Sequence, residues 1–167
     1  QKINIRFSKK IWKLKEEFKT SSRSENTDQV EVIEVVIKKN GYVGRGESTP
    51  YIRYGENISN SIEELNKIKP FIKNGMTRDK LQLKMKPSSA RCALDCAMWD
   101  LEAKEKKKEI WHLLKIKKKT LPLKTTESYG IRPLMQLQSD IKKDNYRSLI
   151  KLKANSENVL KIVSAVN

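Results

Sequence analysis

The amino-acid sequence predicts an α+β module over residues 1–118, followed by the start of a parallel α/β module over residues 119–167. Three observations carry this prediction. Two strand-like segments flank an Asn-Gly pair near residue 40, a long amphipathic helix follows Pro87, and a strand-helix-strand-helix rhythm follows the basic run 115–119. A length of 167 residues suits one domain, or one small domain and part of another.

The first module is expected to begin with three antiparallel strands. Residues 3–14 alternate in polarity, which is typical of a strand, and place Ile3, Ile5 and Phe7 on one face. Residues 30–37 are a β-branched run, and Asn40-Gly41 behind them is the strongest short-range signal for a hairpin that returns through 42–46. These segments predict a meander.

A helix with apolar residues at helical spacing is predicted between residues 62 and 72. Ser59 or Ser61 is expected to cap its start, because a serine side chain accepts hydrogen bonds from the free amides of the first turn. Gly75 is expected to end the helix, and Pro70 to kink it, because proline removes a backbone donor.

A longer helix is predicted after Pro87, with Ser88 or Ser89 as its cap. Its apolar stripe over residues 90–101 is rich in small side chains, which favours close packing against a neighbouring element. A short amphipathic helix is expected at 110–114.

The second module alternates strands with helices. Strands are predicted at 121–129 and 148–153, and helices at 132–143 and 158–166. This order at this spacing predicts βαβ units in a parallel sheet, because two parallel strands need a crossover connection, which is usually a helix.

The net charge of +16 is compatible with nucleic-acid binding, but the kind and distribution of the basic residues argue against it. Of the 36 basic residues 28 are Lys and only 8 are Arg, the residue that base readout favours, and the Lys residues are scattered along the chain. A free-standing basic binding module stays open as a non-catalytic alternative. No run approaches the ~20 apolar residues of a membrane span. Cys92 and Cys96, one helical turn apart, are predicted to be buried thiols of a cytoplasmic protein.

Two strings in the first module resemble a known family. Residues 89–104, SARCALDCAMWDLEAK, are close to a helix signature of the muconate-lactonizing branch of the enolase superfamily, and residues 47–56, ESTPYIRYGE, resemble a segment of its dipeptide epimerases. The resemblance implies an α+β capping domain, a three-stranded antiparallel meander plus helices, followed by the first βα units of a (β/α) TIM-like barrel. Only the N-terminal part of that fold is covered.

Lys151 and Lys153 are the candidate catalytic residues. Period-two alternation puts both ammonium groups on one face of the predicted strand, while Ile150 and Leu152 face the helices. From the sequence pattern alone, two solvent-exposed lysines at a strand end are as good an explanation as a catalytic pair. By resemblance, this is the family's Lys-x-Lys on the second barrel strand, with Lys153 as acid/base and Lys151 as its electrostatic helper.

The resemblance implies Mg²⁺-assisted removal of the α-proton next to a carboxylate, in dipeptides such as L-Ala-D/L-Glu. A second lysine nearby makes chemical sense, because like-charge repulsion helps an ammonium group to lose its proton and become a base. The family's metal ligands and second acid/base lysine come later than Asn167, so the 167-residue chain alone is expected to be inactive and to hold no metal ligand. Muconate cycloisomerase and o-succinylbenzoate synthase, of the same superfamily, are alternatives.

Three further residues are candidates for substrate binding. Arg23 lies in a polar loop, 16–28, and can pair with a carboxylate, although a solvated loop arginine is as good an explanation. Thr126 and Ser128 end the first barrel strand, where hydroxyls are also ordinary strand residues. The expected partner is a small dipeptide, without membrane or nucleic acid, and a homo-oligomer is compatible with the sequence.

Overall fold

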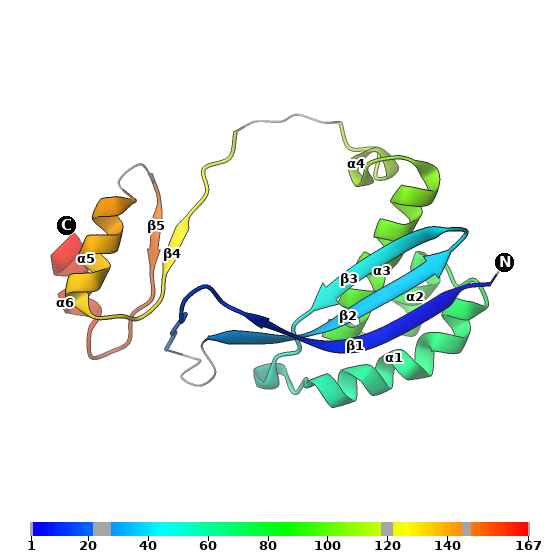
Figure 1. Ribbon diagram of the computed structural model, residues 1–167, viewed down its shortest axis with the longest axis horizontal. Helices are drawn as coiled ribbons and strands as arrows, with labels where there is room; N and C mark the ends of the chain where they lie inside the picture. The colour runs from blue at the N-terminus through cyan, green and yellow to red at the C-terminus, as the bar shows by residue number, and fades with distance from the viewer. Residues whose placement is uncertain (1, 22–27, 118–121, 145–147, 167) are drawn as a thin grey trace. The chain divides into compact units, whose positions relative to one another are not determined.

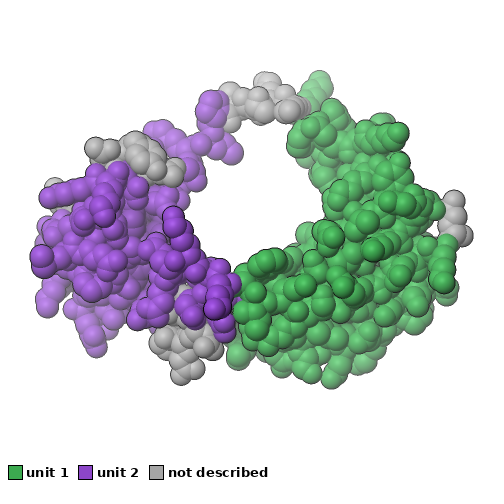
Figure 2. Space-filling view, in the orientation of Figure 1, with its two compact units in different colours: residues 1–12, 31–119 green, residues 13–30, 120–167 purple. Residues whose placement is uncertain are grey.

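A computed structural model describes residues 2–21, 28–117, 122–144 and 148–166. The chain divides into two compact units, drawn in different colours in Figure 2. Unit 1 comprises residues 1–12 and 31–119, and unit 2 comprises residues 13–30 and 120–167. None of the helices in the described ranges is long and apolar enough to cross a membrane.

Unit 1 contains the predicted antiparallel meander. Its strands are β1 (Asn4–Lys13), β2 (Gln29–Lys39) and β3 (Tyr42–Ser48), hydrogen-bonded in the order β1-β2-β3. Asn40 and Gly41, with φ values of 51° and 80°, form the two-residue turn between β2 and β3, as the sequence predicted. Both residues need a left-handed backbone there, and Asn and Gly are the residues that adopt it most readily.

Helices cover one face of this sheet (Figure 1). A short 3₁₀ helix η1 (Ile52–Tyr54) is followed by α1 (Ile58–Lys73), α2 (Arg78–Lys84), α3 (Ser89–Lys106) and α4 (Ile110–Leu113). Ile33, Val35 and Ile37 of β2 point into the core, where they meet fully buried side chains of the helices, among them Leu65, Leu81 and Leu94. This burial is the main stabilising contribution of unit 1.

Two helix predictions need correction. The cap of α1 is Asn57, not Ser59 or Ser61, because Asn57 accepts from the Asn60 amide at 2.9 Å while Asn60 accepts from the Asn57 amide at 2.9 Å. The sequence reasoning also missed α2, whose cap is Thr77. Ser88 caps α3, in agreement with the prediction.

The prediction of buried thiols is wrong for Cys92 and Cys96, which are both exposed and free. The core-facing stripe of α3 is formed by Ala90, Ala93, Leu94, Ala97 and Leu101. The two cysteines are outside this stripe, and their spacing of one turn is as compatible with a buried stripe as with an exposed position. Partial loss of solvent around the exposed Cys96, followed by the effect of the neighbouring Cys92, raises the pKa of the Cys96 thiol.

Close contact between β3 and α3 depends on two glycines. A Cβ atom at Gly44 would lie 2.2 Å from the Ala97 carbonyl oxygen, and one at Gly46 would lie 2.0 Å from the Ala93 carbonyl oxygen. Small residues on both elements therefore let the helix backbone rest directly on the strand, as the small-residue stripe predicted.

Unit 2 contains the predicted parallel pair. β4 (Glu127–Tyr129) and β5 (Ile150–Leu152) are parallel neighbours, and α5 (Leu134–Lys143) and α6 (Val159–Val166) follow them (Figure 1). Both strands are shorter than predicted: β4 begins at Glu127, and residues 122–126 have no strand partner among the described residues. A strand needs a neighbour to satisfy its backbone, so its length depends on pairing that the sequence pattern does not reveal.

Candidate functional site

The β4–β5 pair packs one face on α5 and α6, and no helix in the described part of the chain covers its other face. Tyr129 of β4 and Leu152 of β5 are register partners and both contact the apolar cluster built on Leu137 of α5 and Ile162 of α6. Since neighbouring side chains of a strand point to opposite faces, Ser128 and its register partner Lys151 point to the other face. Ile150 departs from the prediction, because 38% of it is exposed and it is outside this cluster.

Lys153 continues this face beyond the last residue of β5. Its backbone amide donates to the Tyr129 carbonyl oxygen at 2.9 Å, so the hydrogen-bond ladder extends one residue past the strand. Lys151 is exposed and Lys153 half-buried. The two lysines, two residues apart, and Ser128 beside Lys151 therefore lie at the carboxyl ends of two parallel strands, which is where the active sites of barrel enzymes lie.

The remaining predicted site residues are placed differently. Thr126 is exposed and directly precedes β4 rather than ending a strand. Arg23 lies outside the described residues. The structure therefore brings together Ser128, Lys151 and Lys153 only.

A contact that sequence reasoning missed lies at the same end of β4. The Ile131 amide donates to the Lys19 carbonyl oxygen at 2.8 Å, so the segment that follows β1 is docked on the residues that follow β4. The residue between strand and contact is Gly130, which is buried. A lone glycine after a strand was the one available signal, but it does not say which distant segment would approach.

Next to this contact in the sequence, the largely buried side chains of Tyr129 and Arg132 each bind a carboxylate. The Tyr129 hydroxyl donates to Asp144 Oδ2 at 2.7 Å. Burial, followed by the hydrogen bond to Asp144 and the charge of that carboxylate, raises the pKa of Tyr129 to about 12. The Arg132 side chain, only 10% exposed, pairs with Asp140 at 2.6 Å. Charge and hydrogen bonding thus fix the loop between β4 and α5.

Metal ligation finds no support in the described part of the chain. No three His, Cys, Asp or Glu side chains gather there into a group that could hold an ion. The described residues therefore do not fit a magnesium cage.

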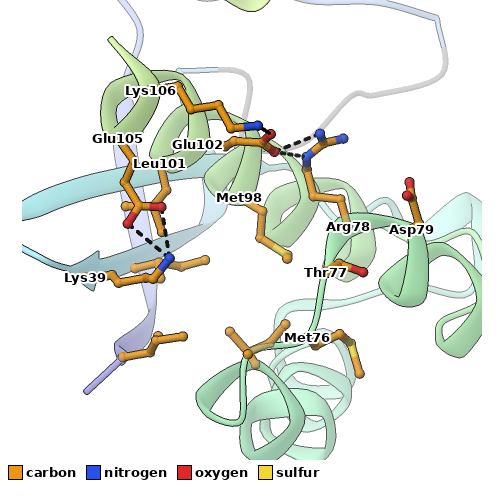
Figure 3. A pocket seen from close by; sticks show the side chains of 14 residues that line it. Lys39, Met76, Thr77, Arg78, Asp79, Met98, Leu101, Glu102, Glu105 and Lys106 are labelled. Carbon is orange, nitrogen blue, oxygen red and sulfur yellow. Dashed lines mark hydrogen bonds and ion pairs between the residues drawn. The ribbon is translucent and has the colours of Figure 1, made fainter. Parts of the chain in front are cut away.

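Unit 1 contains a cavity of about 470 Å³, shown in Figure 3. Its rim carries charged side chains that neutralise one another: Lys39 lies 3.0 Å from Glu105, and Glu102 lies 2.8 Å from Arg78 and 2.6 Å from Lys106. The hydrogen bond from Lys106 and the pairing with Arg78 lower the pKa of Glu102 against the opposing effect of burial. None of the predicted site residues that the structure describes lines this cavity.

Comparison with known proteins identifies the family. Residues 2–115 match the family profile of the mandelate racemase / muconate lactonizing enzyme N-terminal domain. The L-Ala-D/L-Glu epimerase of Escherichia coli K12 is 34% identical over 118 residues, which are 71% of this chain and 35% of the relative. An N-acetyl-D-glutamate racemase of a Pseudoalteromonas species is 30% identical over 140 residues, 81% of this chain and 43% of the relative. The chain thus spans less than half the length of these relatives.

Similar solved structures lead to the same family. An enolase family member from Agrobacterium tumefaciens with homology to dipeptide epimerases, solved with bound sodium and L-Ala-L-Glu, has a TM-score of 0.83 and 28% identity, over 98% of this chain and 50% of its own. Further structures with the same fold, at or below 20% identity, include magnesium complexes. The meander and helices of unit 1 are the N-terminal capping domain of this fold, and the parallel pair in unit 2 begins its barrel. The chain therefore belongs to the mandelate racemase / muconate lactonizing enzyme family of the enolase superfamily, of which it carries the N-terminal part.

Proposed function

We propose that this chain is the N-terminal part of an epimerase that inverts the α-carbon next to a carboxylate in dipeptides such as L-Ala-D/L-Glu. The observation that carries the proposal is the position of Lys151 and Lys153, on the helix-free face at the carboxyl end of β5. Similarity to an L-Ala-D/L-Glu epimerase supports the choice of substrate class.

In the proposed mechanism, Lys153 is the acid/base. Its neutral Nζ takes the α-proton, and the electron pair of the broken C–H bond moves into the carboxylate to give an enediolate. Return of a proton to the opposite face of the α-carbon inverts it, while a proton returned from Lys153 restores the original configuration. The inverting proton donor would be a second lysine from a later barrel strand.

Lys151 is proposed to act through charge. Its ammonium group, on the same face two residues away, offers positive charge to the developing enediolate. The described residues do not fit the magnesium ion that the resemblance implies, so this proposal assigns them no metal ligand.

We propose a cytoplasmic location for the protein. Free thiols at Cys92 and Cys96 agree with this location.

Isotope exchange tests the proposal. The full-length protein, with Mg²⁺, is incubated with L-Ala-L-Glu in deuterated water, and the signal of the Glu α-proton is followed by NMR. Replacing the base removes proton transfer, so Lys153→Ala should slow exchange by about 10²–10⁴-fold. Lys153→Arg should be as slow, because its guanidinium keeps the charge and does not act as a base.

Two controls separate chemistry from lost charge. Lys142→Ala removes an exposed lysine in the last turn of α5 and should leave exchange unchanged. Lys151→Arg should retain more activity than Lys151→Ala, since only the latter removes the positive charge. A Lys153→Ala enzyme with wild-type exchange would disprove the assignment.

A second candidate is supported by the similarity to an N-acetyl-D-glutamate racemase. N-acetyl-glutamate and L-Ala-L-Glu both carry a glutamate α-proton next to a carboxylate and an acylated nitrogen, so the same lysines serve both reactions. The dipeptide carries a free amino group, which N-acetyl-glutamate lacks. A kcat/KM at least tenfold higher for N-acetyl-glutamate than for L-Ala-L-Glu would select this alternative.

A further inference from the structure

The segment that follows β1 belongs to unit 2 although it is distant from the rest of that unit in sequence. Residues 13–30 group with residues 120–167. The structure describes residues 13–21 and 28–30 of this segment, and the first of these stretches meets the carboxyl end of β4 through main-chain and side-chain contacts. We call residues 16–21 the docked segment.

The main chain of Lys19 lies close to the main chains of Gly130 and Ile131. The Ile131 amide donates to the Lys19 carbonyl oxygen at 2.8 Å. A Cβ atom on the preceding residue, Gly130, would lie 2.9 Å from the Lys19 nitrogen and 3.0 Å from the Lys19 oxygen. These neighbours are backbone atoms that cannot rotate away, so any larger residue at 130 would push the docked segment off the strand end.

The side-chain contact comes from Arg132. Its Nη1 atom lies 2.6 Å from Asp140 Oδ2 in α5, and its guanidinium group lies 5.7 Å from the centre of the Tyr129 ring. Its Nη2 atom lies 3.8 Å from Glu16 Oε1. Contacts with Asp140 of α5 and with the Tyr129 ring therefore orient Arg132 so that its Nη2 atom faces Glu16 of the docked segment.

The docked segment lies at the strand end that carries the proposed base. The Lys153 amide donates to the carbonyl oxygen of Tyr129, the last residue of β4, and Gly130 directly follows that residue. Only Gly130 therefore separates Tyr129, which accepts from the Lys153 amide, from Ile131, which donates to the Lys19 carbonyl oxygen.

We propose that Gly130 and Arg132 are positioning residues, which fasten the docked segment to the carboxyl end of β4 so that it forms one wall of the substrate site. This inference rests on the proposed epimerase function. Neither residue takes part in proton transfer. Loosening the wall changes how tightly the substrate is held, while Lys153 and its chemistry stay in place, so the effect is expected on KM rather than on kcat.

The test uses the full-length protein and two readouts. Hydrogen–deuterium exchange of peptides that cover residues 13–21 and Ile131 reports docking, without any need for activity. The kinetics of L-Ala-L-Glu epimerisation report the effect on the site. Gly130→Ala removes the Ile131–Lys19 hydrogen bond, which is worth about 1 kcal/mol, and should speed exchange and raise KM about fivefold or more, with kcat within about twofold.

Three further variants separate an effect on the site from a general loss of stability. Leu137→Ala empties the core of unit 2 without touching the docked segment, so it should lower the melting temperature and leave KM unchanged. Arg132→Gln keeps the glycine contact and should give a smaller rise in KM than Gly130→Ala. Glu16→Gln removes the carboxylate that Arg132 faces in the docked segment, so it should raise KM by about as much as Arg132→Gln.

The outcomes separate the two proposals. Unchanged exchange of residues 13–21 in Gly130→Ala would overturn the docking. Faster exchange with an unchanged KM would overturn the role of the docked segment as a wall. Absence of turnover in the wild-type protein would count against the proposed function, while the exchange readout would still decide the docking.

Discussion

At the scale of single residues, Tyr129 joins the core of unit 2 to its strand ends. Its ring is buried, its hydroxyl donates to Asp144, and its carbonyl oxygen accepts from the Lys153 amide. The hydrogen bond to Asp144 exists only while the phenol keeps its proton.

Tyr129→Phe should destabilise unit 2 by about 1 kcal/mol at neutral pH, because it deletes one partly buried hydrogen bond to a charged group. The pKa of Tyr129 is raised from 10.0 to about 12, so its contribution is complete below pH 10 and is lost as the pH rises towards 12. Denaturant unfolding of the full-length protein between pH 8 and 12 measures this.

The matched control is Tyr54→Phe, which removes a hydroxyl from a side chain that is 77% exposed and should change nothing. If the difference between wild type and Tyr129→Phe stayed constant from pH 8 to pH 12, the raised pKa would not be coupled to folding.

At the scale of elements, the contact of β3 with α3 decides how unit 1 is packed. Gly46→Ala would place a methyl group 2.0 Å from the Ala93 carbonyl oxygen, which forces the helix away from the strand. Overpacking of this kind costs about 1–3 kcal/mol, and the melting temperature should fall by about 5 °C or more.

Arg45→Ala is the control for the same strand. Arg45 is the neighbour of Gly46, but its side chain is on the exposed face and pairs with Glu34 at 3.2 Å. Loss of an exposed pair costs at most about 1 kcal/mol. A Gly46→Ala protein as stable as Arg45→Ala would show that the helix can shift without penalty.

The elements that local patterns predicted are those with strong local signals. The Asn40-Gly41 turn and the cap at Ser88 need only neighbouring residues, and both are confirmed. The missed helix α2 has seven residues and one buried side chain, Leu81, so it depends on packing rather than on its own periodicity. Asn57 and Ser59 are both good capping residues, and the choice between them depends on the reciprocal bond with Asn60.

The candidate site was predictable in part for the same reason. Alternation along β5 was enough to put Lys151 and Lys153 on one face, opposite Leu152. The docking of Lys19 on Gly130 and Ile131 was not predictable, because it joins residues far apart in the sequence through backbone atoms, which no side-chain pattern reports.

At the scale of the whole molecule, the two units differ in how much apolar surface they bury. Unit 1 has a large buried cluster, whereas the described core of unit 2 has three buried side chains, Tyr129, Leu137 and Ile162. Several large apolar side chains of unit 2 are exposed, including Met135, Leu160 and Val163. Exposed apolar surface of this kind is typical of an interface with further structure.

Hydrogen–deuterium exchange should show this difference directly. In a protein of these 167 residues alone, amides of α1 and α3 should exchange at least about 100-fold more slowly than amides of β4 and β5, because a small core gives little protection against local opening. The same β4 and β5 amides should become protected in the full-length protein. Equal protection in both proteins would show that unit 2 is stable by itself.

The division of unit 2 into two stretches of sequence has a consequence for the order of folding. Residues 13–21 leave the ribosome well before Gly130 and Ile131, so the docked segment has no partner while unit 1 is being made. Closing so long a loop carries an entropic cost that grows with the logarithm of its length, and a folded unit 1 shortens the free part of that loop. Docking is therefore expected among the last contacts to form during biosynthesis, and a slow-folding variant of unit 1 should delay it without weakening it at equilibrium.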